Sequence, residues 1–488
     1  MVNEQAKQLG LPFGTAEEAA QAATDGRAAR AQAMAATYAE PKPKSKEKTV
    51  LSATMEAACA GLTGAFEKIA SNKGAAGPDR QSVKTMREHW STLRPKLEAA
   101  LLDGSYRPGN IRRVWIPKAG GGERGLGIPN VVDRVVQEAV RAVLEPLYEP
   151  SFATQSHGFR PERSCHTAIA AAKQHVEEGY DWVVDLDLEK FFDRVNHQRL
   201  MSRLAQRVID KRLLVLIGQM LKAKVVMPDG VVVSTEEGVP QGGPLSPLLS
   251  NVVLDELDQE LIERGHRFVR YADDCNIYVR SERAGQRVMA SVTAFIERRL
   301  RLKVNTEKSA VARPEERHFL GFRLRQEALD GSVEVLLSER TSKRISERIL
   351  ELTPRNFGGS LDACIQRLNE YLRGWIGFFK VCTGGVEKQL AALDAHIRRR
   401  LRAIQLKHWK RKRTIAQRLI QMGIKRDRAW RSVYGGRKSL WSLSHTSTVD
   451  RALRNTYWVA RGLESLAKLW CGLNSPRVAP AQLVLALG

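Results

Sequence analysis

The chain has 488 residues and a formal net charge of +24, from 78 Lys and Arg against 54 Asp and Glu. Hydrophobic residues make up 43% of the chain and charged residues 27%, which suits sizeable buried cores and excludes a chain that is disordered throughout. No apolar run approaches the roughly 18 residues that span a bilayer, and no basic segment followed by an apolar stretch opens the chain. We therefore expect a cytoplasmic protein without a membrane partner.

The positive charge is concentrated near the C-terminal end. Residues 355–488 carry 26 basic and 7 acidic side chains, whereas residues 51–354 carry 45 and 41. The same C-terminal segment holds six of the nine tryptophans. This distribution predicts an anionic partner for the end of the chain rather than for its body.

The predicted elements begin after an Ala-rich leader. Residues 1–50 end in a Lys/Pro-rich stretch and predict marginal helicity followed by a linker. The next residues have a globular pattern, in which β-branched runs predict strands. A tight Ala-Asp-Asp connection between the last two runs predicts a hairpin. These strands are expected at 113–117, 181–187, 266–271 and 275–280.

A loop rich in Gly and Pro precedes a long predicted helix. The loop is GVPQGGPLSP at residues 238–247, where Ser246 and Pro247 suit the N-cap and first turn of the helix. One apolar stripe then repeats every four residues, at Leu249, Val253, Leu257 and Leu261. Beyond residue 360 two more helical stripes follow, at 361–379 and 390–404, and arginines interleave the second one.

Two acidic clusters stand out, at residues 183–193 and 271–275. Adjacent aspartates at a hairpin repel each other and require a compensating cation. Asp187, at the end of an apolar strand, would join Asp273 and Asp274 if the two strands are neighbours. Carboxylates on adjacent strand ends make a site for two divalent cations in phosphoryl transfer. The alternative is that Asp273 and Asp274 are ordinary turn residues.

The second cluster, Tyr271-Ala-Asp-Asp274, resembles the YxDD box of reverse transcriptases. Asp187–Asp193 and Val195–His197 resemble the first catalytic strand of the group II intron-encoded subgroup, and residues 238–251 resemble its template loop and helix. Leu368–Trp375 resembles its thumb and maturase region. Further matches run in family order over roughly residues 51–325, at 72–79, 116–118, 125–138, 156–164, 302–308 and 319–322.

The resemblance implies an α+β right-hand polymerase with antiparallel sheets, followed by a helical thumb and a basic helical maturase region. The expected domains are a flexible leader (1–50), fingers and palm (51–325), a thumb (326–410) and a basic RNA- or DNA-binding region (411–488). Many relatives end in a Cys-paired endonuclease, and no such spacing occurs here. The chain therefore resembles an endonuclease-less lineage that primes from an existing DNA end.

The resemblance also implies roles for the carboxylates. Asp187 and Asp273 would bind two Mg²⁺ ions, which Mn²⁺ could replace, with help from the backbone carbonyl of Leu188. Asp274 would orient the site and balance its charge. One metal would activate the primer 3′-hydroxyl, and the other would hold the incoming deoxynucleoside triphosphate.

Five further residues are expected at the nucleotide. Lys118 and Arg124 are candidates for binding the triphosphate; alternatively, they are ordinary surface charges. Lys308 is a candidate for donating a proton to pyrophosphate. Phe192 takes the position of a steric gate against a 2′-hydroxyl, while either Phe191 or Phe192, as neighbours on a strand, should face the core. Gln241 would touch the template or the incoming base.

The basic end is predicted to bind RNA. Residues 394–414 contain nine Lys and Arg and one acidic residue, which is unlike a solvated helix face of mixed charge. Trp409, Trp430, Trp441 and Trp458 lie in or after this run, and aromatic rings beside Arg suit unpaired bases. The candidate contacts are Arg398, Arg399, Arg400, Arg402, Lys407, Lys410, Arg411, Lys412 and Arg413.

Together these features predict an RNA-directed DNA polymerase that forms a ribonucleoprotein with a group II intron RNA and also acts as the maturase of that RNA. A DNA primer and a DNA target are expected as further partners, and the expected location is a bacterial cytoplasm. Two alternatives remain from the sequence. One is a domesticated enzyme in DNA repair or antiviral defence, and the other is a splicing-only RNA-binding protein with an inactive palm.

Overall fold

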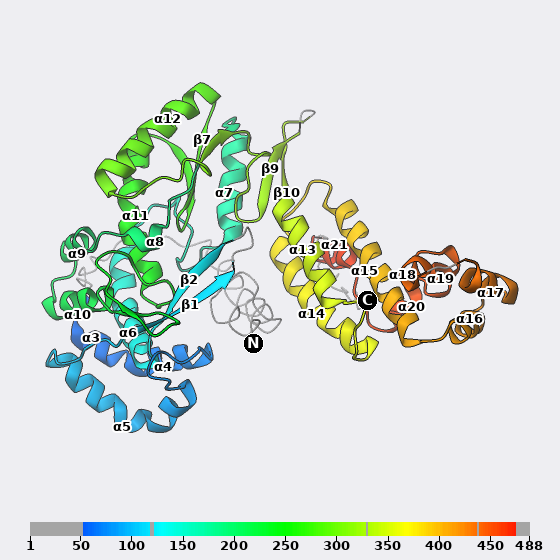
Figure 1. The fold of residues 1–488 in the computed structure, drawn as a ribbon. Helices are drawn as coiled ribbons and strands as arrows, with labels where there is room; N and C mark the ends of the chain where they lie inside the picture. Colours follow the sequence, from blue (N-terminus) through cyan, green and yellow to red (C-terminus); the bar gives the residue numbers. More distant parts are fainter. Residues whose placement is uncertain (1–51, 118–121, 328–329, 437–438, 475–488) are drawn as a thin grey trace, which may run out of the picture. The chain divides into compact units, whose positions relative to one another are not determined.

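The computed structural model describes residues 52–117, 122–327, 330–436 and 439–474. The leader predicted at 1–50 lies outside them. The described chain divides into two compact units. The first comprises residues 52–320 and 324–333, and the second comprises residues 321–323 and the chain from 334 onward. Figure 1 shows the order of the elements along the chain.

The first unit begins with a cluster of helices, α3 (Met55–Ala60), α4 (Leu62–Ser71), α5 (Val83–Leu102) and α6 (Val131–Tyr148). Most sides of helix α6 are buried, and its buried apolar residues include Val135, Val136 and Val140. The helix packs against α3 and α4. A single apolar core runs from these helices into the rest of the unit. These contacts place α6 at the centre of the helical cluster.

The first four-stranded sheet has the order β2-β1-β4-β5. Strands β1 (Ile111–Pro117) and β2 (Glu123–Ile128) are antiparallel, with Ile116 opposite Arg124. The two-residue strands β4 (Val225–Val226) and β5 (Val232–Val233) extend it. Strand β1 confirms the strand predicted at 113–117.

The second four-stranded sheet has the order β6-β7-β3-β8, and its neighbouring strands are antiparallel. Its strands confirm three predicted strand segments. Those three are β3 (Trp182–Leu186), β6 (Arg267–Tyr271) and β7 (Asp274–Val279), and the fourth strand, β8 (Ala310–Ala312), was not predicted. Helices α7 (Cys165–Glu177), α11 (Ser246–Glu263) and α12 (Glu282–Phe295) pack against the strands. Apolar residues on both faces of β3, such as Val183 and Val184, are buried, so the sheet forms the centre of the unit.

Helix α11 begins where the Gly/Pro loop ends, but its cap differs from the prediction. Leu245, not Ser246, is the N-cap residue. The Ser246 hydroxyl instead donates a hydrogen bond of 2.6 Å to the carbonyl of Pro240. Because that bond closes the preceding loop on itself, Ser246 orders the loop rather than the helix end. In the predicted stripe, Leu249, Leu257 and Leu261 are buried and Val253 is half-buried.

Shorter helices complete the first unit. They are α8 (Phe191–Arg194), α9 (His197–Ala205), α10 (Lys211–Leu221), η1 (Glu149–Ser151) and η2 (Ile296–Leu300).

The second unit is mainly helical. The chain divides between the two units within the two-stranded sheet of β9 (Phe322–Gln326) and β10 (Val333–Leu337). All seven residues of the stripe predicted within 361–379 are buried in α14, and four of the five in α15 are buried as well. The helices are α13 (Glu339–Leu352), α14 (Leu361–Phe379), α15 (Val386–His408), α16 (Lys412–Gln421), α17 (Arg426–Tyr434), α18 (Leu440–Ser444), α19 (Ser447–Ala452), α20 (Asn455–Ala460) and α21 (Leu466–Asn474).

The fold is therefore α+β, with antiparallel sheets in the first unit and a helical second unit, as predicted. Among the described residues no helix combines the length and the apolar character needed to cross a membrane.

Candidate active site

The candidate site is built on the hairpin between β6 and β7. Tyr271 pairs with Asp274, so only Ala272 and Asp273 form the turn. This corrects the expected three-residue connection, because Asp274 already belongs to β7. Ala272 has a φ of +56°, a left-handed conformation that is uncommon for residues other than glycine. The turn therefore needs support from its surroundings.

That support comes from Arg270, whose side chain is completely buried. Its guanidinium donates to both carboxylate oxygens of Asp258 on α11, at 2.7 and 2.5 Å. It also donates to the backbone carbonyl of Ala272 at 2.8 Å. Asn251 and Ser156 accept its remaining hydrogen bonds, at 3.0 and 2.8 Å. One arginine thus connects the turn to α11 and to a distant loop, a network that sequence reasoning did not identify.

The distant loop runs alongside β6. The backbone of Arg270 donates to the Gln155 carbonyl at 2.9 Å and accepts from the His157 N–H at 2.8 Å. The amide of Asn251 donates to the Gly158 carbonyl at 2.9 Å. A Cβ atom on Gly158 would lie 2.2 Å from the backbone nitrogen of Ala272, so only glycine fits there. The segment 156–164, noted in the sequence as a motif, therefore holds the hairpin from its other side.

Asp187 lies beside this hairpin, immediately after β3. Leu186 pairs with Cys275 of β7, which places Asp187 next to the start of that strand. The Asp187 N–H donates to Ser309 Oγ at 3.0 Å, and its carbonyl accepts from the Asn305 N–H at 2.8 Å. The sheet therefore brings the end of β3 and the 271–274 turn to one edge, as the sequence predicted.

The carboxylates act on one another electrostatically. Burial and the charge of Asp187 raise the pKa of Asp273. Part of the Asp274 side chain reaches solvent, yet surrounding protein atoms raise its pKa to about 7, with contributions from the charges of Asp273, Asp185 and Asp187. Negative charge therefore gathers at this edge of the sheet.

Asp185 is a fourth carboxylate that sequence reasoning missed. It precedes Asp187 by two residues on β3, so both side chains lie on one face of the strand. Its Oδ2 accepts hydrogen bonds of 2.6 and 2.9 Å from Arg317. The strand alternation was the available signal, since it places residues 185 and 187 on the same side.

Two of the predicted cationic residues lie near these carboxylates. The Lys308 Nζ atom is 3.6 Å from Asp187 Oδ2. Arg124 on β2 is exposed, and its charge lowers the pKa of both Asp273 and Asp274. Lys118, the other predicted triphosphate ligand, lies outside the described residues. The structure thus brings Arg124 and Lys308 to the carboxylate edge from opposite parts of the chain.

The donor set has the chemistry of a divalent metal site. Carboxylate oxygens of Asp187 and Asp273, with a backbone carbonyl such as that of Leu188, are the hard ligands that Mg²⁺ prefers. The neighbouring carboxylate charges, which add to burial in raising the pKa of Asp273 and Asp274, are of the sign that attracts a cation. In the part of the chain that is described, no three His, Cys, Asp or Glu side chains are already arranged as a metal-binding group.

Phe192 belongs to the short helix α8, which follows Asp187 in the chain. Phe191 is buried in the core at 2% exposure, whereas Phe192 is only half-buried, and the rings meet edge to face at 5.2 Å. The predicted division between a core ring and an accessible ring is confirmed. Its stated reason is wrong, because the two residues are in a helix and not in a strand.

The loop that contains Gln241 lies against both α8 and β2. The Val239 N–H donates to the Phe192 carbonyl at 2.6 Å, and the Gly127 N–H donates to the Gln241 carbonyl at 2.7 Å. Gly242 has a φ of +122°, and a Cβ there would lie 2.5 Å from the Gly127 carbonyl oxygen. The glycine permits a close approach to β2, the strand that also carries Arg124.

The predicted RNA-binding residues of the second unit separate into two groups. Arg399, Lys407, Lys410, Arg411, Lys412 and Arg413 are exposed, and Arg398 is half-buried. Arg400 and Arg402 are buried, at 6% and 7% exposure. Arg400 donates to Thr353 Oγ1 at 3.1 Å, and Arg402 forms an ion pair with Asp450. We therefore assign these two arginines a structural role.

One of the four tryptophans predicted near RNA is part of the core. Trp458 is 1% exposed, and its indole N–H donates to the Leu453 carbonyl at 2.9 Å. Trp409, Trp430 and Trp441 are half-buried, so part of each indole reaches the surface.

Two family profiles match successive parts of the chain. "Reverse transcriptase (RNA-dependent DNA polymerase)" matches residues 116–324, and "Group II intron, maturase-specific domain" matches residues 342–421. The first covers the candidate site, and the second covers α14, α15 and the basic run that follows.

Individual relatives agree with these profiles. Protein YkfC of Escherichia coli (strain K12) is 33% identical over 339 residues, which are 61% of this chain and 86% of the relative. Group II intron-encoded protein LtrA of Lactococcus lactis subsp. cremoris is 38% identical over 208 residues, covering 42% of this chain and only 34% of LtrA. A solved partial Cas6-RT-Cas1–Cas2 complex matches 54% of this chain and 46% of its own, at 22% identity and a TM-score of 0.32. At that TM-score the match supports no conclusion.

Proposed function

Because the chain belongs to the family of group II intron reverse transcriptases and maturases, we propose that it copies a group II intron RNA into DNA and binds that RNA to assist its splicing and mobility. The observation that carries the proposal is the meeting of Asp187, Asp273 and Asp274 at one edge of the sheet, where the positive charge of Arg124 acts on Asp273 and Asp274.

Asp187 and Asp273, with the Leu188 carbonyl, would hold two Mg²⁺ ions, which neutralise the triphosphate and lower the pKa of the attacking 3′-hydroxyl when bound. Asp274 balances the charge of the site. The guanidinium of Arg124 binds triphosphate oxygens, a contact for which its paired N–H donors are suited. Lys118 shares that contact in the proposal.

Lys308 and Gln241 complete the proposed nucleotide contacts. The Lys308 ammonium, already beside Asp187, gives a proton to the departing pyrophosphate oxygen. Gln241 touches the template or the incoming base, since its loop lies against β2. The half-buried ring of Phe192 lies under the sugar and excludes a 2′-hydroxyl, so the substrates are deoxynucleoside triphosphates.

The exposed basic residues of α15 and α16 bind the intron RNA. Their positive charge attracts the phosphate backbone, and this contribution weakens as salt rises. A DNA strand at the target supplies the primer. We propose that the fingers and palm end at residue 325 and that the thumb ends at residue 410. The first of these boundaries lies in the β9–β10 hairpin, within which the two compact units divide.

Asp273→Ala tests the proposal directly. We expect the variant to lose primer extension on an RNA template, because a ligand of the proposed metal site is removed, while its affinity for intron RNA stays within about twofold of the parent protein. Extension is measured with a labelled DNA primer, and RNA affinity by filter binding.

Asp229→Ala is the matched control, because Asp229 is an exposed aspartate in the turn between β4 and β5. It should retain both activities. Equal loss of extension and of RNA binding in Asp273→Ala would mean that the aspartates only maintain the fold, and the proposed catalytic role would be rejected.

A further inference from the structure

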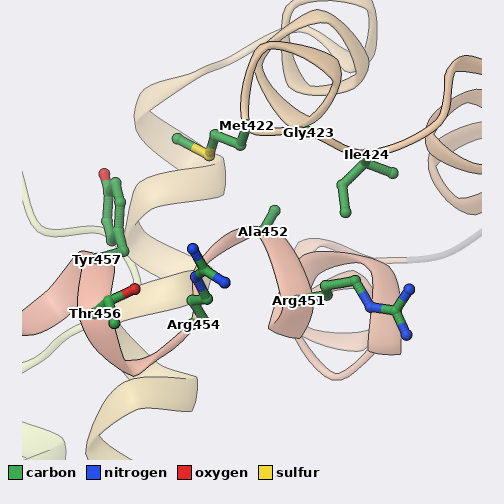
Figure 2. Close-up of a pocket in the computed structure, with 8 residues that line it drawn as sticks. All are labelled: Met422, Gly423, Ile424, Arg451, Ala452, Arg454, Thr456 and Tyr457. Atoms are coloured by element: carbon green, nitrogen blue, oxygen red, sulfur yellow. The ribbon is translucent and has the colours of Figure 1, made fainter.

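A cavity of about 440 Å³ opens in the second unit, among α16, α19 and α20. Figure 2 shows the segment 422–424, which follows α16, on one side of the cavity, and residues 451–457 on the other. The lining consists of Met422, Gly423, Ile424, Arg451, Ala452, Arg454, Thr456 and Tyr457. None of these residues has a role in the function proposed above.

The cavity is positively charged. Arg451 and Arg454 line it, both are exposed, and no Asp or Glu is among the lining residues. Within the described parts of the chain neither arginine forms an ion pair. The nearest carboxylate in sequence, that of Asp450, is bound to Arg402 instead. Each of the two guanidinium groups is therefore available to a phosphate at the cavity.

The other lining residues are apolar or aromatic. Met422 and Ile424 lie across the cavity from Tyr457 (Figure 2). The Tyr457 hydroxyl is within 3.0 Å of Gln405 Oε1 on α15, which holds the ring in position. An aromatic ring and a thioether, both polarizable, offer a surface on which a planar base can pack. The cavity therefore combines an anion site with a site for an apolar, planar group.

We infer that this cavity binds one nucleotide of a single-stranded nucleic acid, with its phosphate at Arg451 and Arg454 and its base between Met422 and Tyr457. The inference rests on the proposed function, which it extends by naming a contact site. The volume lies in the roughly 300–1,000 Å³ range of pockets for small-molecule-sized groups. A base in a duplex is stacked and paired, whereas an unpaired base is free to enter.

The surrounding charge favours a nucleic acid over a free nucleotide or an acidic peptide. Residues 411–461 contain thirteen Lys and Arg and two acidic residues. Such a surface continues to attract phosphates on both sides of the inserted nucleotide. An acidic peptide would satisfy the arginines but would have no flat group to place against Tyr457.

A matched pair of variants tests the cavity without removing packing. Thr456 lines the cavity, whereas the preceding residue, Asn455, does not. Both are exposed and belong to the first turn of α20, so Thr456→Glu and Asn455→Glu add the same charge to the same helix end. We expect Thr456→Glu to weaken the binding of single-stranded oligonucleotide about tenfold, and Asn455→Glu to weaken it less than about threefold.

A second pair removes positive charge. The double variant Arg451→Ala/Arg454→Ala should lose clearly more affinity than Arg426→Ala/Arg428→Ala, which removes two exposed arginines of α17 that do not line the cavity. Affinity is measured by fluorescence anisotropy on the full chain with labelled single-stranded RNA, single-stranded DNA and duplex RNA, and with polyglutamate as competitor. Thermal unfolding verifies that each variant is folded.

The outcomes separate the possible failures. Greater loss in the cavity variants for single strands than for duplex supports the inference, and the stronger of the RNA and DNA responses identifies the source of the nucleotide. Equal losses within each pair, equal losses for duplex, or competition by polyglutamate that depends on the cavity would overturn it. Primer extension by the parent protein on an annealed RNA template tests the proposed function separately, since the cavity variants should retain it.

Discussion

At the scale of single residues, Arg270 connects the turn of the candidate active site to α11 and to the loop at residues 155–158. It is wholly buried and bonded on all sides, and it holds the carbonyl of Ala272, whose backbone is in a left-handed conformation. A buried ion pair contributes little net stability, but removing one partner leaves an uncompensated charge. We therefore regard Arg270 as a positioning residue for the turn that carries Asp273.

Arg270→Gln should destabilise the protein by about 3–5 kcal/mol, because the Asp258 carboxylate is left buried without its cation. The double variant Arg270→Met/Asp258→Leu removes both charges and should recover most of that loss. Its turn would still lack the hydrogen bond to Ala272, so single-nucleotide incorporation should stay at least about tenfold slow in kcat, with KM for the nucleotide little changed. Thermal unfolding and single-turnover kinetics measure the two effects. Full recovery of kcat in the double variant would show that Arg270 serves stability alone.

The accessible ring of Phe192 offers a second prediction at this scale. Phe192→Ala should admit ribonucleotides and reduce discrimination by the sugar about tenfold or more, since a flat apolar surface is lost. The ratio of kcat/KM for deoxy- and ribonucleotides measures this. Phe191→Leu is the control: its ring is in the core, so we expect lower stability with unchanged discrimination. Unchanged discrimination in Phe192→Ala would refute the gate.

At the scale of elements, α15 shows how one helix serves two purposes. Its apolar stripe and two of its arginines face the interior, while Arg399 and Lys407 face outward. Arg400 and Arg402 are buried: Arg400 donates a hydrogen bond to Thr353, and Arg402 forms an ion pair with Asp450. Only the outward group remains for the predicted RNA contact.

Arg400→Ala and Arg399→Ala should therefore differ although the residues are adjacent. Arg400→Ala should lower stability by about 1.5–3 kcal/mol, because hydrogen bonds from a charged donor are lost. Arg399→Ala should leave the melting temperature unchanged and weaken RNA binding. Thermal unfolding and RNA titration at fixed salt distinguish them. A matching fall in melting temperature for both variants would contradict the assignment.

At the scale of the whole molecule, charge and chemistry are separated along the chain. Residues 51–354, which contain the candidate active site, are almost balanced in charge, and the excess lies in residues 355–488. This division agrees with the two family profiles, one on each part. Residues 51–354 do not need a large net positive charge to attract a nucleic acid, because the basic residues 355–488 supply that attraction.

Local patterns were sufficient for much of the fold and for the three aspartates. The segments around Val183 and Ile277 are rich in apolar residues, which predicts strands. In the sequence the Asp273-Asp274 pair follows one predicted strand and precedes the next. The sequence also predicted the apolar stripe of α14, and its residues are buried. These features depend on residues within one or two turns or strand repeats, so periodicity alone predicts them.

The rest depended on contacts between distant segments. Ser156 and Arg270 are 114 residues apart, and Asp185 and Arg317 are 132 apart. No periodic signal reports such pairs, nor the burial of Arg400 or the cavity beside Arg454. By itself the sequence determined where the positive charge lies and predicted which residues carry the chemistry, because composition and short-range spacing contain that information. Only the tertiary structure decided which of the described arginines are buried with partners and what holds the 271–274 turn, because burial and partnership arise when remote parts of the chain pack together.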